Sequence, residues 1–246
     1  MTPADIEAIE RATLGAVIPE AQEESNGWIL PFDSGTVGRA KSAVPLHHAP
    51  PDPAMLSRIE AAYCAHGLPP AFRVPVLPSF EPFRAALAAR GYVEHTLTDV
   101  CTAAASSVAA VSAGPAAEVR NMPHDDWASV FLGEGFDPVD GASRVRKLSQ
   151  GADTLFATIR DGEGPVAAGA AAFSHGWASV HGMRTAGHCR GRGLAGRVLA
   201  TLACEAMRKG YRQVFLQVAA DNAPAQALYR RAGFGKRWSY SYWRRA

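Results

Sequence analysis

A short basic turn rich in glycine contains the residue types best suited to a chemical task. It has the sequence Arg190-Gly191-Arg192-Gly193 and leads into an apolar helix expected over residues 194–208. The two glycines let backbone N–H groups come close to a ligand, and the two arginines add positive charge. The N-terminus of a helix also favours anions. The turn therefore predicts a binding site for the pyrophosphate of a nucleotide-like ligand.

A second motif follows about thirty residues later and contains a tyrosine. Asp221 or Asn222 is expected to cap a short helix, because either side chain can accept a hydrogen bond from the first turn. Tyr229 lies on this helix, and Gly233-Phe234 ends it. A tyrosine hydroxyl can donate a proton to a reacting group. The alternative is that the ring of Tyr229 only packs against the sheet.

The glycine turn also contains the letters of a dinucleotide fingerprint, G-x-G-x-x-G, at Gly191, Gly193 and Gly196. That interpretation requires further parallel βα units and an acidic residue about 20 positions later. Only 50 residues follow Gly196, and the next strand offers Gln217. The segment before the turn is expected to be an antiparallel sheet. We therefore reject NAD as the ligand.

Strands are expected on both sides of the turn to hold it in place. Before it we expect strands over residues 153–159, 166–173 and 178–185, the first two joined by a hairpin at 161–164. After helix 194–208 we expect a strand over 211–218 and an aromatic last strand over 238–243. A strand, a glycine turn and a helix in this order form an anion-binding arrangement.

The first half of the chain repeats this order of elements. Helices are expected over 55–63 and 81–90, and strands over 71–76 and 93–101. Gly91-Tyr92 follows the second helix, as Gly233-Phe234 does in the second half. We interpret the repeat as an internal duplication, with an N-terminal domain over 1–114 and a C-terminal domain over 115–246. The expected fold class is α/β (α+β), a mixed central sheet flanked by helices.

The loop that corresponds to the glycine turn in the first half has a different composition. It has the sequence His47-His48-Ala49-Pro50-Pro51-Asp52-Pro53, without a glycine. Prolines lack the N–H groups that hold phosphate oxygens, so this half is not expected to bind a nucleotide. The two adjacent histidines lack a third ligand, and we expect them in solvent rather than on a metal ion.

The overall composition, with 48% hydrophobic and 20% charged residues, is that of a globular protein. No apolar run approaches the roughly 18 residues of a membrane span, and no secretory leader is visible. The four cysteines are scattered, which indicates reduced thiols and no metal site. We therefore expect a cytoplasmic protein without a membrane partner.

The net charge of +2 is unevenly distributed along the chain. Residues 188–246 contain 12 Lys and Arg but only two acidic residues, Glu205 and Asp221. A basic region of this kind is compatible with nucleic-acid binding. Three of its arginines, however, lie in or just after the glycine turn, where a phosphorylated small molecule accounts for them. No nucleic-acid partner is therefore expected.

In this order and so near the C-terminus, the two motifs resemble the signature motifs of the GNAT (GCN5-related N-acetyltransferase) superfamily. The resemblance covers residues 118–246 well and the first half loosely, as in tandem GNAT proteins with one degenerate copy. It implies a GNAT fold and acetyl-CoA as the co-substrate. The cofactor contacts that we expect are Met183, Arg184, Thr185, Arg190, Gly191, Arg192, Gly193, Leu194, Ala195, Gly196, Asn222 and Tyr229.

The resemblance also assigns roles in catalysis. It places Tyr229 at the position of the family's general acid, and the oxyanion near the backbone N–H of Met183. His181 lies two residues before Met183, which predicts a shared strand face and makes it a candidate base. Glu134, in the region that lines the family's acceptor pocket, is a second candidate. Proton loss through water is the alternative.

The expected activity is therefore N-acetyl transfer from acetyl-CoA to an amine, by direct attack and without a covalent acyl-enzyme. Cys189, beside the glycine turn, is the formal candidate for a nucleophile in the covalent route. The alternative function is a non-catalytic acyl-CoA sensor or a pseudo-acetyltransferase. The acceptor, a small molecule or a peptide, and the oligomeric state are left open by the sequence.

Overall fold

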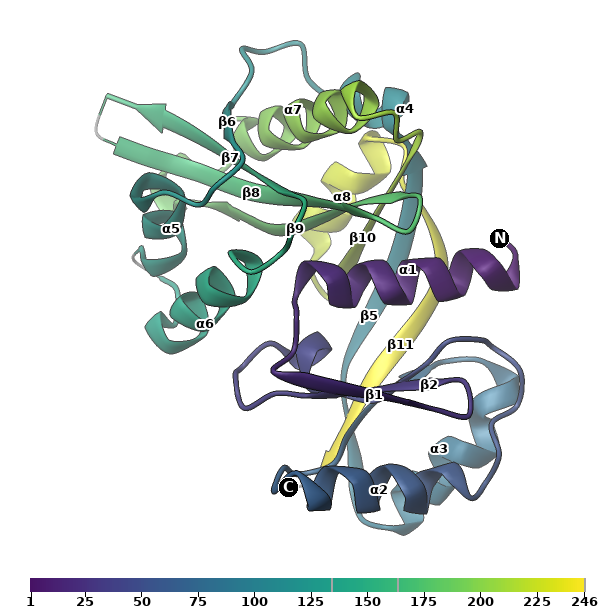
Figure 1. Cartoon of the computed structure of the whole chain (residues 1–246). Coiled ribbons are helices and arrows are strands. Elements are labelled where there is room, and N and C mark those ends of the chain that lie inside the picture. Colours follow the sequence, from purple (N-terminus) through teal and green to yellow (C-terminus); the bar gives the residue numbers. More distant parts are fainter. Residues whose placement is uncertain (134, 163, 246) are drawn as a thin grey trace.

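A computed structural model describes residues 1–133, 135–162 and 164–245 (Figure 1). Within these residues, strands of both halves of the chain form one mixed sheet of eight strands. Its order is β4-β11-β5-β10-β9-β8-β7-β6. The strands are β4 (Ala71–Pro75), β5 (Tyr92–Ala104), β6 (Glu118–Arg120), β7 (Thr154–Asp161), β8 (Gly164–Ser174), β9 (Trp177–Thr185), β10 (Gln213–Ala219) and β11 (Gly235–Arg245).

A smaller sheet of three strands belongs to the first half. It consists of β1 (Ala21–Ser25), β2 (Trp28–Phe32) and β3 (Val44–Pro45). A parallel bridge between Ala43 and Phe72 connects the start of β3 to β4. The N–H of Ala43 donates to Ala71 O at 2.9 Å, and the N–H of Arg73 donates to Ala43 O at 2.8 Å. The small sheet therefore continues into the large one.

The last strands of the two halves are exchanged. β5 ends the first half but pairs antiparallel with β10 of the second, from Gln213↔Ala104 to Ala219↔Thr98. β11 ends the second half but pairs with β4 of the first, from Tyr240↔Pro75 to Arg244↔Ala71. The two exchanged strands also pair with each other, and in Figure 1 they run side by side between the halves. We refer to this arrangement as the strand exchange.

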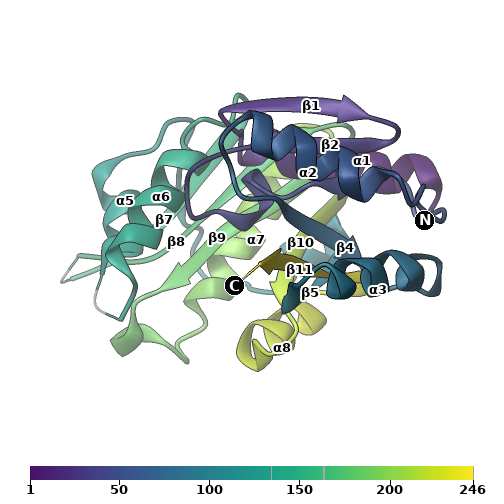
Figure 2. The same ribbon diagram turned by 90° about the horizontal axis from the view of Figure 1, so that it is seen from below.

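The helices lie on both sides of the central strands. They are α1 (Pro3–Ala16), α2 (Met55–Ala65), α3 (Glu81–Ala89), α4 (Ala105–Ala109), α5 (Asp125–Leu132), α6 (Pro138–Leu148), α7 (Leu194–Arg208) and α8 (Ala223–Arg231), with short 3-10 turns η1 (Gly38–Ala40), η2 (Pro78–Phe80) and η3 (Gly187–Cys189). Figure 2 shows α1, β1 and β2 on one side of β10 and β11, and α8 on the other.

Each side of the sheet has its own hydrophobic cluster. On the α7 and α8 side, Val198 and Leu202 pack with Leu216 and other apolar residues of the strands. On the α1 side, Ile9 packs with Phe215 and Tyr240. Burial of these two faces fixes β10 between two layers of helices, because alternate residues of a strand point to opposite sides.

The fold class expected from the sequence is confirmed, and several elements begin and end close to the predicted positions. The helix predicted over 194–208 is α7, with the same bounds. The predicted hairpin is formed by β7 and β8. Residue 114, the predicted domain boundary, lies between α4 and β6, and strands from both sides of it share the large sheet. No helix of the described chain is both long and apolar enough to span a membrane.

Candidate active site

β9 and β10 separate from each other in the middle of the sheet. They pair in parallel from Val214↔Ala178 to Leu216↔Val180, and the pairing then stops. β9 continues to Thr185 and β10 to Ala219 without facing each other. The backbone of β9 beyond Val180 therefore has no ladder partner on the β10 side, and hydrogen-bonding groups are available there to an extended ligand. We call this opening the β9–β10 gap.

A β-bulge in β9 lies at the start of the gap. On the other edge of β9, Ala170 pairs with His181 and Ala168 with Arg184, so β9 has one residue more than β8 over this interval. Gly182 has φ +60°, and a methyl group there would lie 2.8 Å from Leu148 Cδ1 and 2.9 Å from Phe131 Cζ. Glycine is therefore required at 182 for both conformation and space.

The bulge changes which side chains share a face. Met183 packs against the α7 side of the sheet, where a methyl group at Gly169 would lie 2.6 Å from Met183 Sδ and 2.8 Å from Val198 Cγ1. His181 instead contacts Phe215, which belongs to the α1 side. The sequence-based expectation that His181 and Met183 share a strand face is therefore wrong, because the extra residue shifts the alternation by one.

The glycine turn connects the end of β9 to α7. Gly191 and Gly193 have φ of +78° and +76°, and Gly193 is the N-cap residue of α7. No side chain caps the helix, so the N–H groups of its first turn have no side-chain acceptor. Leu194 and Gly196 are buried and hold the helix on the sheet, whereas Gly191, Arg192 and Gly193 are exposed. An open helix N-terminus with these glycines is a suitable anion site.

The arginines near the turn differ in their surroundings. Arg190 is exposed at the end of η3. Arg192 Nη1 lies 3.3 Å from Asp161 Oδ2 and donates to Cys189 Sγ at 3.1 Å. Arg197 Nε donates to Pro115 O at 2.8 Å and so attaches the segment between the two halves to α7. Cys189, the candidate nucleophile, is completely buried beneath the turn.

The corresponding loop of the first half is closed by its own side chain. Asp52 Oδ1 accepts a hydrogen bond from Ala54 N at 2.8 Å, directly before α2. The carboxylate thus satisfies the N–H of the residue that precedes α2. His48, expected in solvent, instead packs edge to face on Trp238 at 5.1 Å, and its burial lowers the pKa to about 4.

Tyr229 lies on the last turn of α8 and faces the sheet. It is 9% exposed and packs in the same cluster as Leu216 and Val218 of β10, with Phe234 at 5.8 Å between ring centroids. Burial raises the pKa of Tyr229 to about 12. The hydroxyl is therefore protonated at neutral pH, as a proton donor must be.

Two further predicted cofactor residues have structural contacts of their own. Asn222 caps α8, and its Oδ1 accepts from Ala225 N at 3.2 Å. Arg184 extends from β9 over the ring of Phe136 at 4.3 Å and lies 3.6 Å from Asp140. Thr185 ends β9 and, like Met183, is half-buried beside the gap. Ala195 is half-buried in the first turn of α7.

Of the two candidate bases, the structure describes only His181. His181 is buried, and neither ring nitrogen has a hydrogen-bond partner among the described residues. Burial, together with the nearby charge of Arg39, holds the pKa of His181 well below its usual range, so the ring is neutral. Glu134 lies outside the described residues.

A cavity of about 360 Å³ lies on the α1 side of the sheet, next to the β9–β10 gap. Gln217 and Ala219, two of the β10 residues beyond the end of the pairing with β9, contribute to its wall. Tyr240 and Tyr242 of β11 and Arg39 of η1 line it as well. These residues are not among the site residues predicted from the sequence, although the alternation of Tyr240 and Tyr242 in the aromatic strand indicates that they share a face.

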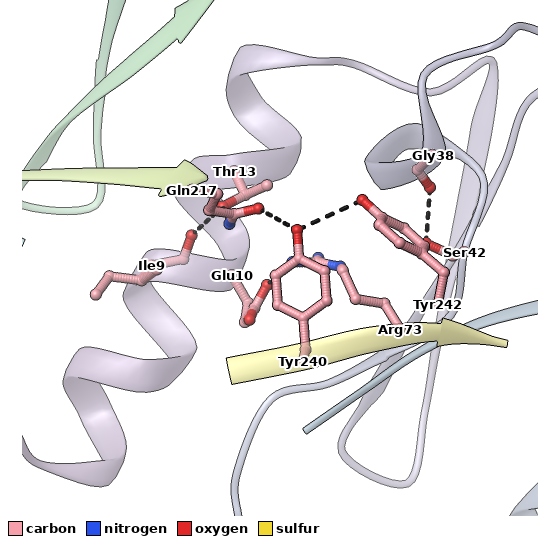
Figure 3. A network of polar contacts seen from close by, with 9 residues as sticks. All are labelled: Ile9, Glu10, Thr13, Gly38, Ser42, Arg73, Gln217, Tyr240 and Tyr242. Atoms are coloured by element: carbon pink, nitrogen blue, oxygen red, sulfur yellow. Dashed lines mark hydrogen bonds and ion pairs between the residues drawn. The ribbon is translucent and has the colours of Figure 1, made fainter. Parts of the chain in front are cut away.

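A hydrogen-bond network fixes the wall of the cavity (Figure 3). Tyr240 Oη donates to Gln217 Oε1 at 2.7 Å, and Gln217 Nε2 donates to Thr13 Oγ1 at 2.9 Å. Tyr242 Oη lies 3.4 Å from Tyr240 Oη. The network joins α1, β10 and β11, so it spans the strand exchange. Among the described residues, no group of three His, Cys, Asp or Glu could hold a metal ion.

Comparisons with known proteins agree with this geometry. A family model described as "Probable histone acetyltransferase Rv0428c C-terminal" matches residues 3–243. A search of the curated proteins found no match. A GCN5-related N-acetyltransferase from Kribbella flavida is 20% identical with a TM-score of 0.72, covering 98% of this chain and 95% of that one.

Two other solved structures share the fold over nearly the whole chain. A tandem GNAT protein from the clavulanic acid biosynthesis pathway is 18% identical with a TM-score of 0.62, covering 98% of this chain and 92% of that one. A conserved protein of unknown function from Staphylococcus epidermidis is 11% identical with a TM-score of 0.69, covering 92% and 94%. At these identities the likeness establishes the fold.

Proposed function

The chain belongs to the family of the probable histone acetyltransferase Rv0428c C-terminal region, within the GNAT superfamily, and from this premise we propose that it transfers an acetyl group from acetyl-CoA to an amine. The observation that carries the proposal is the uncapped N-terminus of α7. Two left-handed glycines precede it, and the strand before them has separated from its neighbour. The uncapped helix N-terminus with its glycines can bind a pyrophosphate, and the unpaired edge of the strand can bind a pantetheine arm.

In this proposal the co-substrate lies along the β9–β10 gap. Its pyrophosphate is held by the N–H groups around Gly193 and by the charges of Arg190 and Arg192. Its pantetheine arm is hydrogen-bonded by the backbone of Met183, Arg184 and Thr185. A backbone N–H of β9 next to the bulge at Gly182 stabilises the charge that develops on the thioester oxygen.

The amine attacks the thioester carbon directly, and the C–S bond breaks as the C–N bond forms. Tyr229 donates its hydroxyl proton to the departing thiolate, which its raised pKa allows because the hydroxyl is protonated before the reaction. For the proton released by the amine we propose His181, which is neutral and lies on the cavity side of the sheet. From His181 the proton returns through water to the Tyr229 phenolate, so that the enzyme regains its starting protonation state after each turnover.

Thermal unfolding with acetyl-CoA and with NADH as the control ligand tests the co-substrate. At 100 times Kd, a ligand stabilises the folded state by about 2.7 kcal/mol, which raises Tm by several degrees. We expect a rise with acetyl-CoA alone, followed by release of free thiol when an amine mixture is added. A rise without thiol release for any amine would instead support the acyl-CoA sensor.

A further inference from the structure

The cavity on the α1 side is lined by cationic side chains from separate parts of the chain. Arg39 comes from η1, Lys41 follows it, Arg144 comes from α6 and Arg244 from β11. Among the described residues that line the cavity there is no Asp or Glu. Four converging positive groups are unusual in a pocket that has to admit an amine, because a charged amine is repelled by them.

Most of this charge is not neutralised within the described part of the chain. Arg144 Nε pairs with Asp140 Oδ2 at 2.6 Å. Arg39 and Lys41 are half-buried, and their side chains form no ion pair or hydrogen bond with a described residue. Glu10 is near enough to sense the charge of Arg39, but its carboxylate lies 2.6 Å from Arg73 Nη1. The cavity therefore has a net positive field, which a bound anion would satisfy.

The structure also fixes the backbone turn that contains Arg39. Ser42 Oγ donates to Gly38 O at 2.7 Å and closes the turn that carries Arg39 (Figure 3). A methyl group at Gly38 would lie 3.0 Å from the ring of Tyr242, so the turn packs directly on β11. The backbone from which the Arg39 side chain extends is therefore fixed, and the planar guanidinium suits recognition of a planar or tetrahedral anion.

Resting on the proposed acetyl transfer, we infer that the acceptor is a small amine whose other end carries an anionic group, a carboxylate or a phosphate. Arg39 and Lys41 bind the anion, and the amine points along Gln217 and Ala219 toward the β9–β10 gap. The cavity volume of about 360 Å³ lies at the lower end of the usual range for small-molecule sites, about 300–1,000 Å³, and fits a molecule of amino-acid size. A polycationic peptide such as an unmodified histone tail fits this field poorly.

Matched pairs of amines test the inference directly. Each amino acid is compared with its decarboxylated amine, and O-phosphoethanolamine with ethanolamine, by thiol release from acetyl-CoA; spermidine and a histone-tail peptide complete the panel. We expect kcat/KM to be at least about tenfold higher for the anionic member of a pair, since a charge-assisted hydrogen bond corresponds to a factor of about 10 to 100. The amino acids and the phosphorylated amine distinguish carboxylate from phosphate recognition.

Variants of cavity residues distinguish a loss of anion recognition from a general disturbance of the fold. Arg39→Met and Lys41→Met should remove most of the preference within a pair, chiefly through KM, while the Tm rise given by acetyl-CoA stays unchanged. Arg208→Met, which removes an exposed arginine of α7, is the matched control and should keep the preference. Equal or lower rates for every anionic member, or a preference that survives both cavity variants, would overturn the inference.

The test separates this inference from the proposed function. Loss of the acetyl-CoA-dependent Tm rise in the unmodified chain would refute the proposed function. In that case, direct binding of the amine pairs, measured by Tm without acetyl-CoA, still decides the inference. A normal Tm rise together with a preference for neutral amines would refute the inference alone.

Discussion

Arg73 Nη1 lies 2.6 Å from a carboxylate oxygen of Glu10, and both side chains are almost fully buried between α1 and β4. The guanidinium also lies 5.1 Å from the ring centroid of Tyr240 (Figure 3). The pair thus joins the first helix to the strand that receives β11. Because both charged groups are shielded from water, each needs the other as its counter-charge.

Removing one member of this pair is expected to destabilise the protein strongly. Arg73→Met should lower the free energy of unfolding by about 3–5 kcal/mol, because it leaves the Glu10 carboxylate buried without a counter-charge. The double variant Glu10→Leu, Arg73→Met should recover most of this loss, because two apolar side chains need no partner. Urea unfolding of the unmodified chain, of Arg73→Met and of the double variant at pH 7 measures the loss and its recovery. A double variant as unstable as Arg73→Met would contradict the explanation.

Replacing Tyr229 by phenylalanine is expected to slow the chemical step. The change removes only the hydroxyl, so kcat should fall by about 10²-fold or more while the KM for acetyl-CoA changes little. Tyr211→Phe is the matched control, because Tyr211 packs on Phe173 at 5.3 Å, away from the gap. Equal kcat values for the two variants would show that Tyr229 only packs against the sheet.

The conformation of Gly193 is expected to control acetyl-CoA affinity. Nothing lies within 4 Å of a methyl group at this position, so Gly193→Ala is disfavoured by its φ of +76° alone. A left-handed residue other than glycine costs about 1–2 kcal/mol, which corresponds to roughly tenfold weaker binding if the turn distorts. Gly187→Ala in the same loop has equal space and no positive φ, and should bind normally. Calorimetric titration with CoA compares the Kd values of the Gly193→Ala and Gly187→Ala variants.

Asp99 is expected to stabilise the strand exchange in a pH-dependent way. Its carboxylate accepts from Ser239 Oγ at 2.6 Å and from Gln226 Nε2 at 3.1 Å, and lies 3.2 Å from Lys236 Nζ. Burial opposes the charged form, but the hydrogen bonds and Lys236 outweigh it and lower the pKa of Asp99 below 3.8. A lowered pKa stabilises the fold above about pH 3.8 and ceases to do so as the pH falls through the folded value.

The variant Asp99→Asn should therefore lose about 2 kcal/mol of unfolding free energy at pH 7. The difference from the unmodified chain should shrink as the pH is lowered below about 3.8. Asp153→Asn is the control, since Asp153 forms an exposed ion pair with Lys209 at 2.7 Å and should change stability by less than about 1 kcal/mol. A pH-independent loss for Asp99→Asn would exclude the charge as its cause.

The elements that could be predicted best from the sequence are those determined by residues close together in the chain. The apolar spacing of α7 is uninterrupted between Gly193 and Gly210, so both ends were predictable. The cap of α8 is Asn222, one of the two residues proposed, because a short polar side chain can satisfy the first turn. The glycine turn likewise has a recognisable composition, and its two left-handed glycines are those singled out from the sequence.

Features that depend on distant partners could not be predicted in the same way. The bulge that separates His181 from the face of Met183 depends on Gly182 fitting against Phe131 and Leu148, which lie 34 or more residues away. The cavity combines η1, α6, β10 and β11, and no periodicity in the sequence connects Arg39 with Tyr240. β5 pairs with β10 and β11 of the second half, and no local pattern in the sequence specifies these distant partners.

The strand exchange makes the two halves dependent on each other for folding. A polypeptide ending near residue 114 would contain β5 without β10 and β4 without β11, and so would expose an edge of β4 and the edges of the long strand β5. Such a fragment is prone to self-association, in the manner of a domain-swapped dimer. Expressed together, the two fragments should instead reassemble, and a gene split at this point becomes a complementation pair whose recovery reports on the contact between them.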